Sequence, residues 1–331
     1  MKFIPLKLFI NISGQNVILP FYHLVSDEDI IHVKHLYNVR KVKEFERDLE
    51  FFLKEYNPLD ISELVDIIRT GSLTKKRGFL LSFDDGLREF SDVIAPILIK
   101  KGIPAICFLN SGFIDNKDMF FRYKTSILIE KIEKLTASDG LLKMVGKWAV
   151  KKNMHFDEGG KFLLSVNYTN RFYLEELAGI LNVDFQEYLK QVKPYMTSIQ
   201  VLSLMQQGFS FGAHSINHPH YSDLTHDQQL DQTLQSIHEI TNKFNPEYKL
   251  FAFPFTDYAI PKQFFNSLYD ENHKNVDLTF GCAGLKKDEF SRNIQRIPIE
   301  TKSFSAQEII YGEYLYYIIK ILLNKNTIKR Y

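Results

Sequence analysis

The chain has 331 residues, of which 45% are hydrophobic and 24% charged, so its length and composition fit one large globular domain or two small ones. Its 41 Lys and Arg residues almost balance 40 Asp and Glu residues, which excludes the basic surface that nucleic-acid binding requires. The two cysteines, Cys107 and Cys282, stand far apart, which excludes a disulfide framework and a thiolate zinc site.

The sequence lacks the features of a targeting or membrane-spanning segment. Pro5 and Lys7 interrupt the N-terminal apolar run before it reaches signal-peptide length, and no run elsewhere approaches the ~20 apolar residues that cross a bilayer. We therefore predict a cytoplasmic protein without a transmembrane segment. The apolar stretch 311–323, followed by three basic residues, predicts either a final packing helix or a peripheral contact with a membrane surface.

Apolar runs and amphipathic segments alternate along the first third of the chain. Residues 17–22 and 78–83 are apolar runs typical of buried strands, and apolar residues at helical spacing over 45–53 favour a helix between them. A helix over 92–101 and a strand over 105–109 continue the pattern. This alternation predicts a mostly parallel sheet or barrel.

The alternation stops between residues 116 and 197, where helical patterns occur without a convincing strand. We predict a helical insertion over 116–197, within a single domain that spans 1–331. Further strands are expected at 209–213, 248–253, 277–280 and 294–297. Polar residues stand where several of these strands end, which is where α/β sheets and barrels place their sites.

Two adjacent carboxylates, Asp84 and Asp85, follow the strand that ends at Phe83. Buried carboxylates are costly unless a cation neutralises them, and Gly86 lets the backbone turn directly after the pair. A divalent-metal site and an ordinary Asp-Gly turn both explain this pattern.

Two histidines, His214 and His218, stand four residues apart, directly after another expected strand. At this spacing both rings lie on one face of a helical turn and can bind one ion; the alternative is one core histidine and one surface histidine. Two imidazole nitrogens and one carboxylate oxygen leave a coordination position for water, which is typical of catalytic zinc sites. The second carboxylate then remains for proton transfer.

These segments resemble the motifs of a known family. Residues 82–86 (Ser-Phe-Asp-Asp-Gly) are similar to the first motif of the NodB-homology polysaccharide deacetylases, and residues 214–219 (His-Ser-Ile-Asn-His-Pro) to the second. The resemblance covers about 18–107 and 205–298. It implies a distorted (β/α) barrel of the polysaccharide deacetylase type with a helical insertion, and an enzyme that removes acetyl groups from N-acetylated sugars or glycans.

The resemblance also implies a role for each motif residue. Asp84 is the implied general base, and Asp85, His214 and His218 are the implied ligands of Zn²⁺ or another divalent transition metal. A Phe-Pro-Phe segment that ends at Phe255 is similar to the third motif. This implies that the N–H of Phe255 helps to form the oxyanion hole.

The sequence departs from the family pattern at two points. The usual arginine before the third-motif proline is missing; Arg296, at the end of an expected strand, either replaces it by pairing with Asp84 or forms an ordinary structural ion pair. The usual C-terminal histidine is also missing. However, Pro-Phe-Tyr-His-Leu-Val around His23 resembles the N-terminal Tyr-His segment of rearranged members, which implies that His23 is the catalytic acid; a satisfied buried histidine is the alternative.

Two more basic residues, Arg122 and Lys124, stand among aromatic residues of the expected insertion. They fit either a contact with a substrate phosphate or carboxylate, or a solvated helix face.

Three functional interpretations compete. The first is a sugar N-deacetylase, the second is a metal-dependent C–N hydrolase of a small amide or imide, and the third is a non-catalytic carbohydrate-binding homologue. The complete set of two aspartates and two histidines favours an enzyme, whereas the altered third motif weakly favours the non-catalytic homologue.

Overall fold

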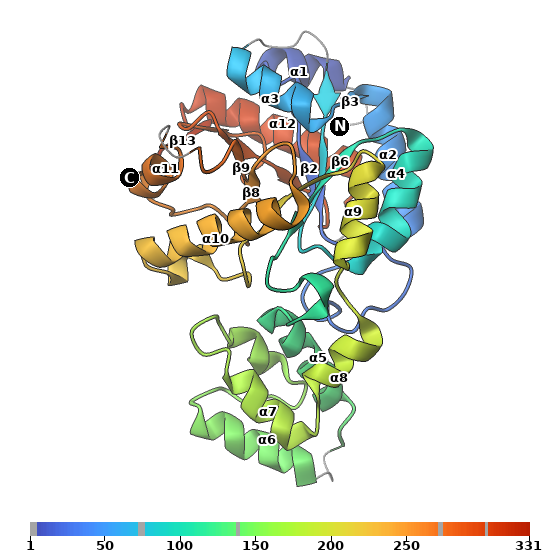
Figure 1. Cartoon of the computed structure of the whole chain (residues 1–331), viewed down its shortest axis with the longest axis vertical. Coiled ribbons are helices and arrows are strands. Elements are labelled where there is room, and N and C mark those ends of the chain that lie inside the picture. Colours follow the sequence, from blue (N-terminus) through green and yellow to red (C-terminus); the bar gives the residue numbers. More distant parts are fainter. Residues whose placement is uncertain (1–4, 72–76, 137–139, 271–273, 302–303) are drawn as a thin grey trace.

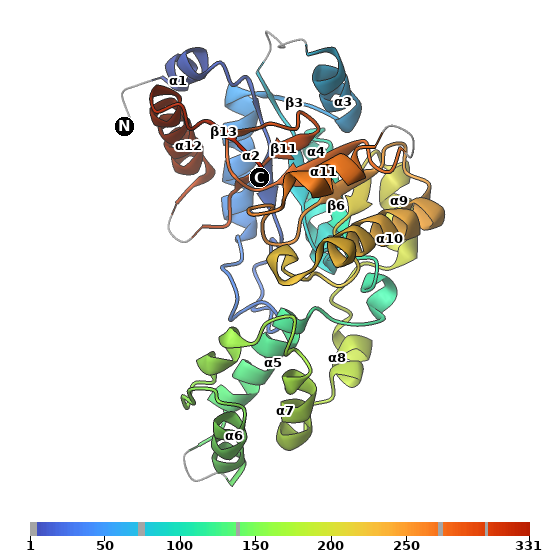
Figure 2. The ribbon, with the colours of Figure 1, turned by 90° about the vertical axis from the view of Figure 1, so that its left-hand side faces the viewer.

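The computed structural model describes residues 5–71, 77–136, 140–270, 274–301 and 304–331. Figure 1 shows a barrel with its surrounding helices and, below it, a lobe made of helices. In Figure 2, turned by 90°, the lobe again projects from one end of the barrel. The site described below lies at this end.

Eight parallel strands form the barrel in the described part of the chain, in the order β11-β9-β8-β7-β6-β5-β2-β12. Their bounds are β2 (Pro20–Tyr22), β5 (Leu81–Phe83), β6 (Ala105–Leu109), β7 (Ser210–Ala213), β8 (Leu250–Ala252), β9 (Leu278–Gly281), β11 (Asn293–Gln295) and β12 (Ile297–Pro298). Because only Arg296 separates β11 from β12, the two outermost strands belong to one short segment and the sheet nearly closes. The expected (β/α) barrel is thereby confirmed.

Two apolar runs that predict single strands each form two short strands. The run 17–22 divides at Leu19 into β1 (Val17–Ile18) and β2, and the run 78–83 divides at Leu80 into β4 (Gly78–Phe79) and β5. β4 pairs with β1 and with β3 (Asn57–Pro58) in a small separate sheet, whereas β2 and β5 pair in the barrel. Both halves of each run are largely buried, so hydrophobicity does not mark the division.

Alternation along the strands divides the barrel side chains between two cores. Ile106 and Phe108 of β6 pack in a cluster with residues of other barrel strands, such as Phe280 of β9, whereas Cys107 and Leu109 pack in the large cluster that includes the surrounding helices. These helices are α1 (Leu6–Ser13), α2 (Val42–Glu55), α3 (Ile61–Thr70), α4 (Ala95–Lys101), α9 (Ser198–Gln206), α10 (His226–Phe244), α11 (Lys262–Leu268) and α12 (Ala306–Leu322). Short helical turns are η1 (Phe90–Ile94), η2 (Ile114–Asn116) and η4 (Tyr221–Asp223).

The apolar stretch near the end of the chain lies mainly in α12. Its buried residues include Ile310, Tyr314 and Tyr317, and the helix packs on α1 and α2. Beyond it, β13 (Thr327–Ile328) pairs with β10 (Lys287–Asp288). No helix in the described ranges is both long and apolar enough to cross a membrane. Contact of the exposed side of α12 with a membrane surface stays a prediction.

The lobe is built around its own hydrophobic core. Its helices are α5 (Phe121–Glu133), α6 (Gly140–Lys151), α7 (Tyr173–Leu181) and α8 (Phe185–Val192), joined by the turn η3 (Lys161–Ser165). Leu128, Val145 and Leu177 are fully buried in this core, which also takes in Leu24 and Val33 from the loop after β2. The lobe therefore packs over the loop after β2. It is formed by the segment in which the sequence shows no strand pattern.

Candidate active site

The residues that the motifs single out meet at one end of the barrel. Asp84 and Asp85 follow β5, His214 follows β7 and His23 follows β2. These strands run parallel, so their carboxyl ends open on the same side, where barrel sites are usually built. The strand order thus brings together residues that lie far apart in the sequence.

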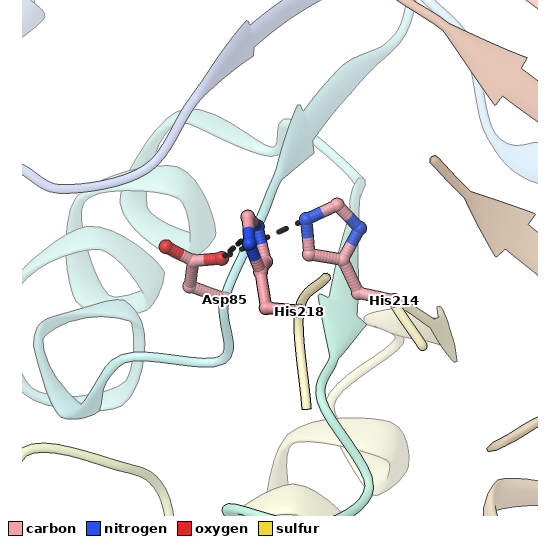
Figure 3. A group of neighbouring side chains, drawn as sticks. All are labelled: Asp85, His214 and His218. Carbon is pink, nitrogen blue, oxygen red and sulfur yellow. Dashed lines mark ion pairs between the residues drawn. The ribbon is translucent and has the colours of Figure 1, made fainter. Parts of the chain in front are cut away.

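The side chains of Asp85, His214 and His218 point toward one another (Figure 3). Oδ1 of Asp85 lies 3.6 Å from Nε2 of His214 and 3.3 Å from Nε2 of His218. Two atoms that bind one zinc ion at about 2.0–2.1 Å with tetrahedral angles lie about 3.3–3.4 Å apart. Among the described residues, neither Oδ1 of Asp85 nor Nε2 of His214 has a hydrogen-bond partner, although both are buried. The three residues therefore fit a metal ion.

Neighbouring groups hold these side chains in the form that a metal requires. His214 donates from Nδ1 to the carbonyl of Ala252 at 2.8 Å, which leaves Nε2 as the free ligand atom. Burial lowers the pKa of His214 to about 4, so the ring is neutral. Burial would raise the pKa of Asp85, but His218 above all keeps it well below its usual range.

A tyrosine from the lobe fixes the other oxygen of Asp85. Tyr123, in the first turn of α5, donates its hydroxyl hydrogen to Oδ2 of Asp85 at 2.6 Å and is fully buried. A hydrogen bond of this kind orients a ligating carboxylate. The sequence did not single out Tyr123, and an aromatic residue in a helix distant along the chain gives no signal that could have done so.

Arg296 holds Asp84 with a two-pronged ion pair. Its Nη1 and Nη2 lie 2.7 and 2.8 Å from the two carboxylate oxygens, and Nη1 also donates to Oγ of Ser82 at 3.1 Å. The guanidinium lies over the rings of Phe21 and Phe108. Burial would raise the pKa of Asp84, but Arg296 and then His214 hold it below its usual value. The carboxylate is therefore ionised and fixed, 4.0 Å from Nε2 of His214.

Replacing Arg296 by Met should destabilise the protein strongly. Asp84 would stay buried without its counter-ion, and breaking a buried pair by removing one partner costs about 3–5 kcal/mol. Arg69→Met removes an exposed pair with Asp66 and should cost less than about 1 kcal/mol. Urea unfolding of both variants measures the difference. Similar losses of unfolding free energy in Arg296→Met and Arg69→Met would show that the Arg296–Asp84 pair is no stronger than a surface pair.

His23 is paired with a carboxylate that the sequence did not single out. Its Nδ1 lies 2.6 Å from Oε2 of Glu300, whose Oε1 accepts hydrogen bonds from the N–H groups of His23 and Leu24, both at 2.8 Å. Burial lowers the pKa of His23, but Glu300 outweighs it and raises the pKa to about 9. His23 is therefore a cation at neutral pH. The sequence signal that could have identified Glu300 is its position, as an acidic residue just past the last barrel strand.

Phe255 lies beside the candidate metal ligand His218, with ring centroids 4.7 Å apart. Its backbone is left-handed, with a φ of 56°, and Asp85 and His218 share this conformation with φ values of 73° and 57°. Non-glycine residues in this region are strained, and such strain clusters at functional sites. Three residues of the candidate site thus share this strained conformation.

A cavity of ≈ 390 Å³ opens onto several residues of the candidate site. His23, Asp85, His218 and Phe255 line it from the barrel, while Phe120, Arg122 and Leu164 line it from the lobe. Its volume lies in the range of small-molecule sites, about 300–1,000 Å³. A small substrate would therefore touch both parts of the molecule.

Comparisons with known proteins agree with this geometry. A family model described as "Polysaccharide deacetylase" matches residues 183–268. Among solved structures, the Streptococcus pyogenes deacetylase PplD in complex with acetate has a TM-score of 0.56 at 14% identity, over 90% of this chain and 97% of that one. IcaB from Ammonifex degensii has a TM-score of 0.56 at 12% identity, over 91% and 98%. This chain has the polysaccharide deacetylase fold.

A third structure with this fold is the de-N-acetylase from Aggregatibacter actinomycetemcomitans, with a TM-score of 0.53 at 14% identity, over 89% of this chain and 99% of that one. Curated proteins give no match. The match to the family model includes His214, His218 and Phe255. Asp84, Asp85 and His23 lie outside it, so their connection to the polysaccharide deacetylase motifs rests on the residues and the geometry above.

Proposed function

We propose that this protein is a metal-dependent hydrolase that removes the acetyl group from N-acetylated sugars or glycans. The observation that carries the proposal is the buried group of Asp85, His214 and His218, with the ionised Asp84 beside it and the cationic His23 on the same cavity. Structures of the same fold described as a deacetylase with acetate and as a de-N-acetylase support the same reaction here.

Asp85, His214 and His218 would hold the metal ion. We propose zinc, because two imidazoles, one carboxylate and an open position are the donor set of catalytic zinc sites. When bound, such an ion polarises the acetamide carbonyl and lowers the pKa of water toward ~7.

The remaining groups divide the proton transfers of amide hydrolysis. Asp84 accepts a proton from the attacking water as its oxygen forms a bond to the acetamide carbon, and Arg296 keeps the carboxylate oriented. The N–H of Phe255 donates to the oxyanion that forms at the carbonyl oxygen. His23 donates its proton to the nitrogen as the C–N bond breaks. The products are acetate and the free amine of the sugar.

Release of both products in equal amounts tests this function. Zinc-loaded protein would be incubated separately with N-acetylated mono- and oligosaccharides and with small amides and imides, and acetate and free amines would be measured. Release of acetate and free amine in equal amounts from an N-acetylated sugar supports the proposal. Hydrolysis of small amides or imides alone would favour the second interpretation, and no hydrolysis would favour a carbohydrate-binding homologue.

Glu300→Gln should move the alkaline limb of the pH–rate profile to lower pH. His23 must be protonated to act as the acid, and the carboxylate of Glu300 is what raises its pKa to about 9. Without that charge, burial lowers the pKa of His23 and only the more weakly acting Asp85 and Asp84 oppose it, so the pKa falls below 9 and the acid is lost at lower pH. Profiles of kcat/KM measure the shift, with Glu313→Gln, a half-buried glutamate bonded to the N–H of Leu285, as control. An alkaline limb that stays in place would exclude this role of Glu300.

A further inference from the structure

Arg122 lines the same cavity as His23, the proposed catalytic acid. It belongs to the first turn of α5 and lines the cavity together with His23, Asp85 and His218. The next residue along the helix, Tyr123, is bonded to Asp85. One helical turn therefore fixes the position of the arginine relative to the metal ligand.

In the described part of the chain, no carboxylate lies within ion-pairing distance of Arg122, and Asp223 acts on its charge only from farther away. The Arg122 side chain is half-buried, its Nη1 donates to the carbonyl of Leu164, and its Cζ lies 5.2 Å from the ring centroid of Phe121. A guanidinium has five N–H donors, and withdrawing its charge from water without an anion is unfavourable. The group is therefore available for an anion that enters the cavity.

Comparable cations nearby are already neutralised. Arg296 is paired with Asp84, and Lys124, two residues after Arg122, is paired with both Asp118 and Glu175. The charge of Lys124 is thus matched by two exposed acids of the lobe, which disfavours a contact with a substrate anion. The same explanation does not extend to Arg122.

The rest of the cavity suits a sugar with a negative charge. Of the described residues that line it, Asp85 is the one acid, and the proposed metal would offset its charge. The charge of His23 is matched by Glu300, so within the described ranges Arg122 is the cation on this cavity that lacks a contacting carboxylate, while Tyr37, Phe120 and Phe255 supply aromatic surface against which a sugar ring can pack. A neutral sugar would leave Arg122 without a contacting anion.

We propose that the substrate is an N-acetylated sugar that carries an oxyanion, a phosphate or a carboxylate, on or next to the acetylated residue, and that Arg122 binds this group. The planar fork of a guanidinium binds such oxyanions with two parallel hydrogen bonds. Arg122 would thus determine specificity, whereas Asp84 and His23 transfer protons. The inference rests on the proposed function, which it narrows to anionic substrates.

Binding of deacetylated products tests the role of Arg122 without turnover. Calorimetry of the zinc-loaded protein would compare glucosamine 1-phosphate, glucosaminuronic acid and methyl glucosaminide, which has the same amine but no oxyanion. Wild type should bind one or both of the sugars with an oxyanion about tenfold to a hundredfold more tightly than methyl glucosaminide, and Arg122→Gln should lose this preference. Arg171→Gln is the matched control, because Arg171 belongs to the same lobe and lines a different cavity. It should behave like wild type.

Each outcome decides one claim. Equal affinity of wild type for the three sugars, or a preference that survives Arg122→Gln, would overturn the role of Arg122. Tighter binding of the phosphate or of the uronic acid identifies the anion. In a parallel assay, acetate release from the N-acetylated forms of the same sugars tests the proposed function. Absence of acetate would contradict deacetylation, whereas the binding data would still decide the role of Arg122.

Discussion

The Asp84→Asn variant is expected to lose about a hundredfold to ten-thousandfold in turnover while it keeps its metal. The substitution preserves the size of the side chain but removes the oxygen that accepts the proton of the attacking water, and a positioned acid or base contributes about 10²–10⁴ in rate. Asp84 itself is not among the three residues that converge as ligands. Metal content should therefore stay near that of wild type.

A second buried aspartate provides the control for this variant. Asp48 is paired with Arg40 at 2.7 Å and is as buried as Asp84, but its ion pair is with Arg40, whereas Asp84 lies 4.0 Å from Nε2 of His214. Asp48→Asn should reduce stability through the loss of a buried pair, with turnover of the folded protein largely retained. If both variants lose turnover to the same extent, Asp84 acts only in the structure and is not the base.

His23→Gln is expected to lose about a hundredfold or more on an acetamide sugar and much less on an activated acetyl ester. An amide must have its nitrogen protonated before the C–N bond breaks, whereas the leaving group of an activated ester departs with little help. The pKa of about 9 and the place of His23 on the cavity motivate this role. Steady-state rates on the two substrates give the comparison.

Two outcomes distinguish the roles of His23. A larger loss on the amide identifies it as the acid, and His220→Gln is a control because His220 stacks on Phe255 at 5.2 Å without lining the cavity. Equal losses on amide and ester would mean that His23 shapes the site and that another group protonates the amine.

The sequence predicted those parts of the fold and site that depend on neighbours along the chain. The apolar run that ends at Phe83 is followed at once by Asp84 and Asp85, and β7 is followed at once by His214, so strand and site signals coincide. The prediction of a single strand over 17–22 was wrong, because the chain passes from the small sheet to the barrel at the buried Leu19. Nothing local distinguishes that leucine from its neighbours.

Contacts across long separations carry no comparable signal. Tyr123 meets Asp85 across 38 positions, and Glu300 meets His23 across 277. Both depend on how the lobe and the last barrel strands pack, which periodicity does not report. Arg296 was a candidate partner of Asp84 in the sequence, but its place between β11 and β12, where the barrel closes, follows only from the strand order.

Titration of metal-free protein with Zn²⁺, with acetate release from an N-acetylated sugar measured at each step, tests the central claim most directly. Activity should rise in proportion to added zinc and level off at about one ion per chain, because Asp85, His214 and His218 form a single buried group. The His214→Ala/His218→Ala double variant should bind no ion there and release no acetate, whereas His220→Ala/His226→Ala should follow wild type. Acetate release that is unchanged in metal-free protein, or in the His214/His218 double variant, would contradict the account.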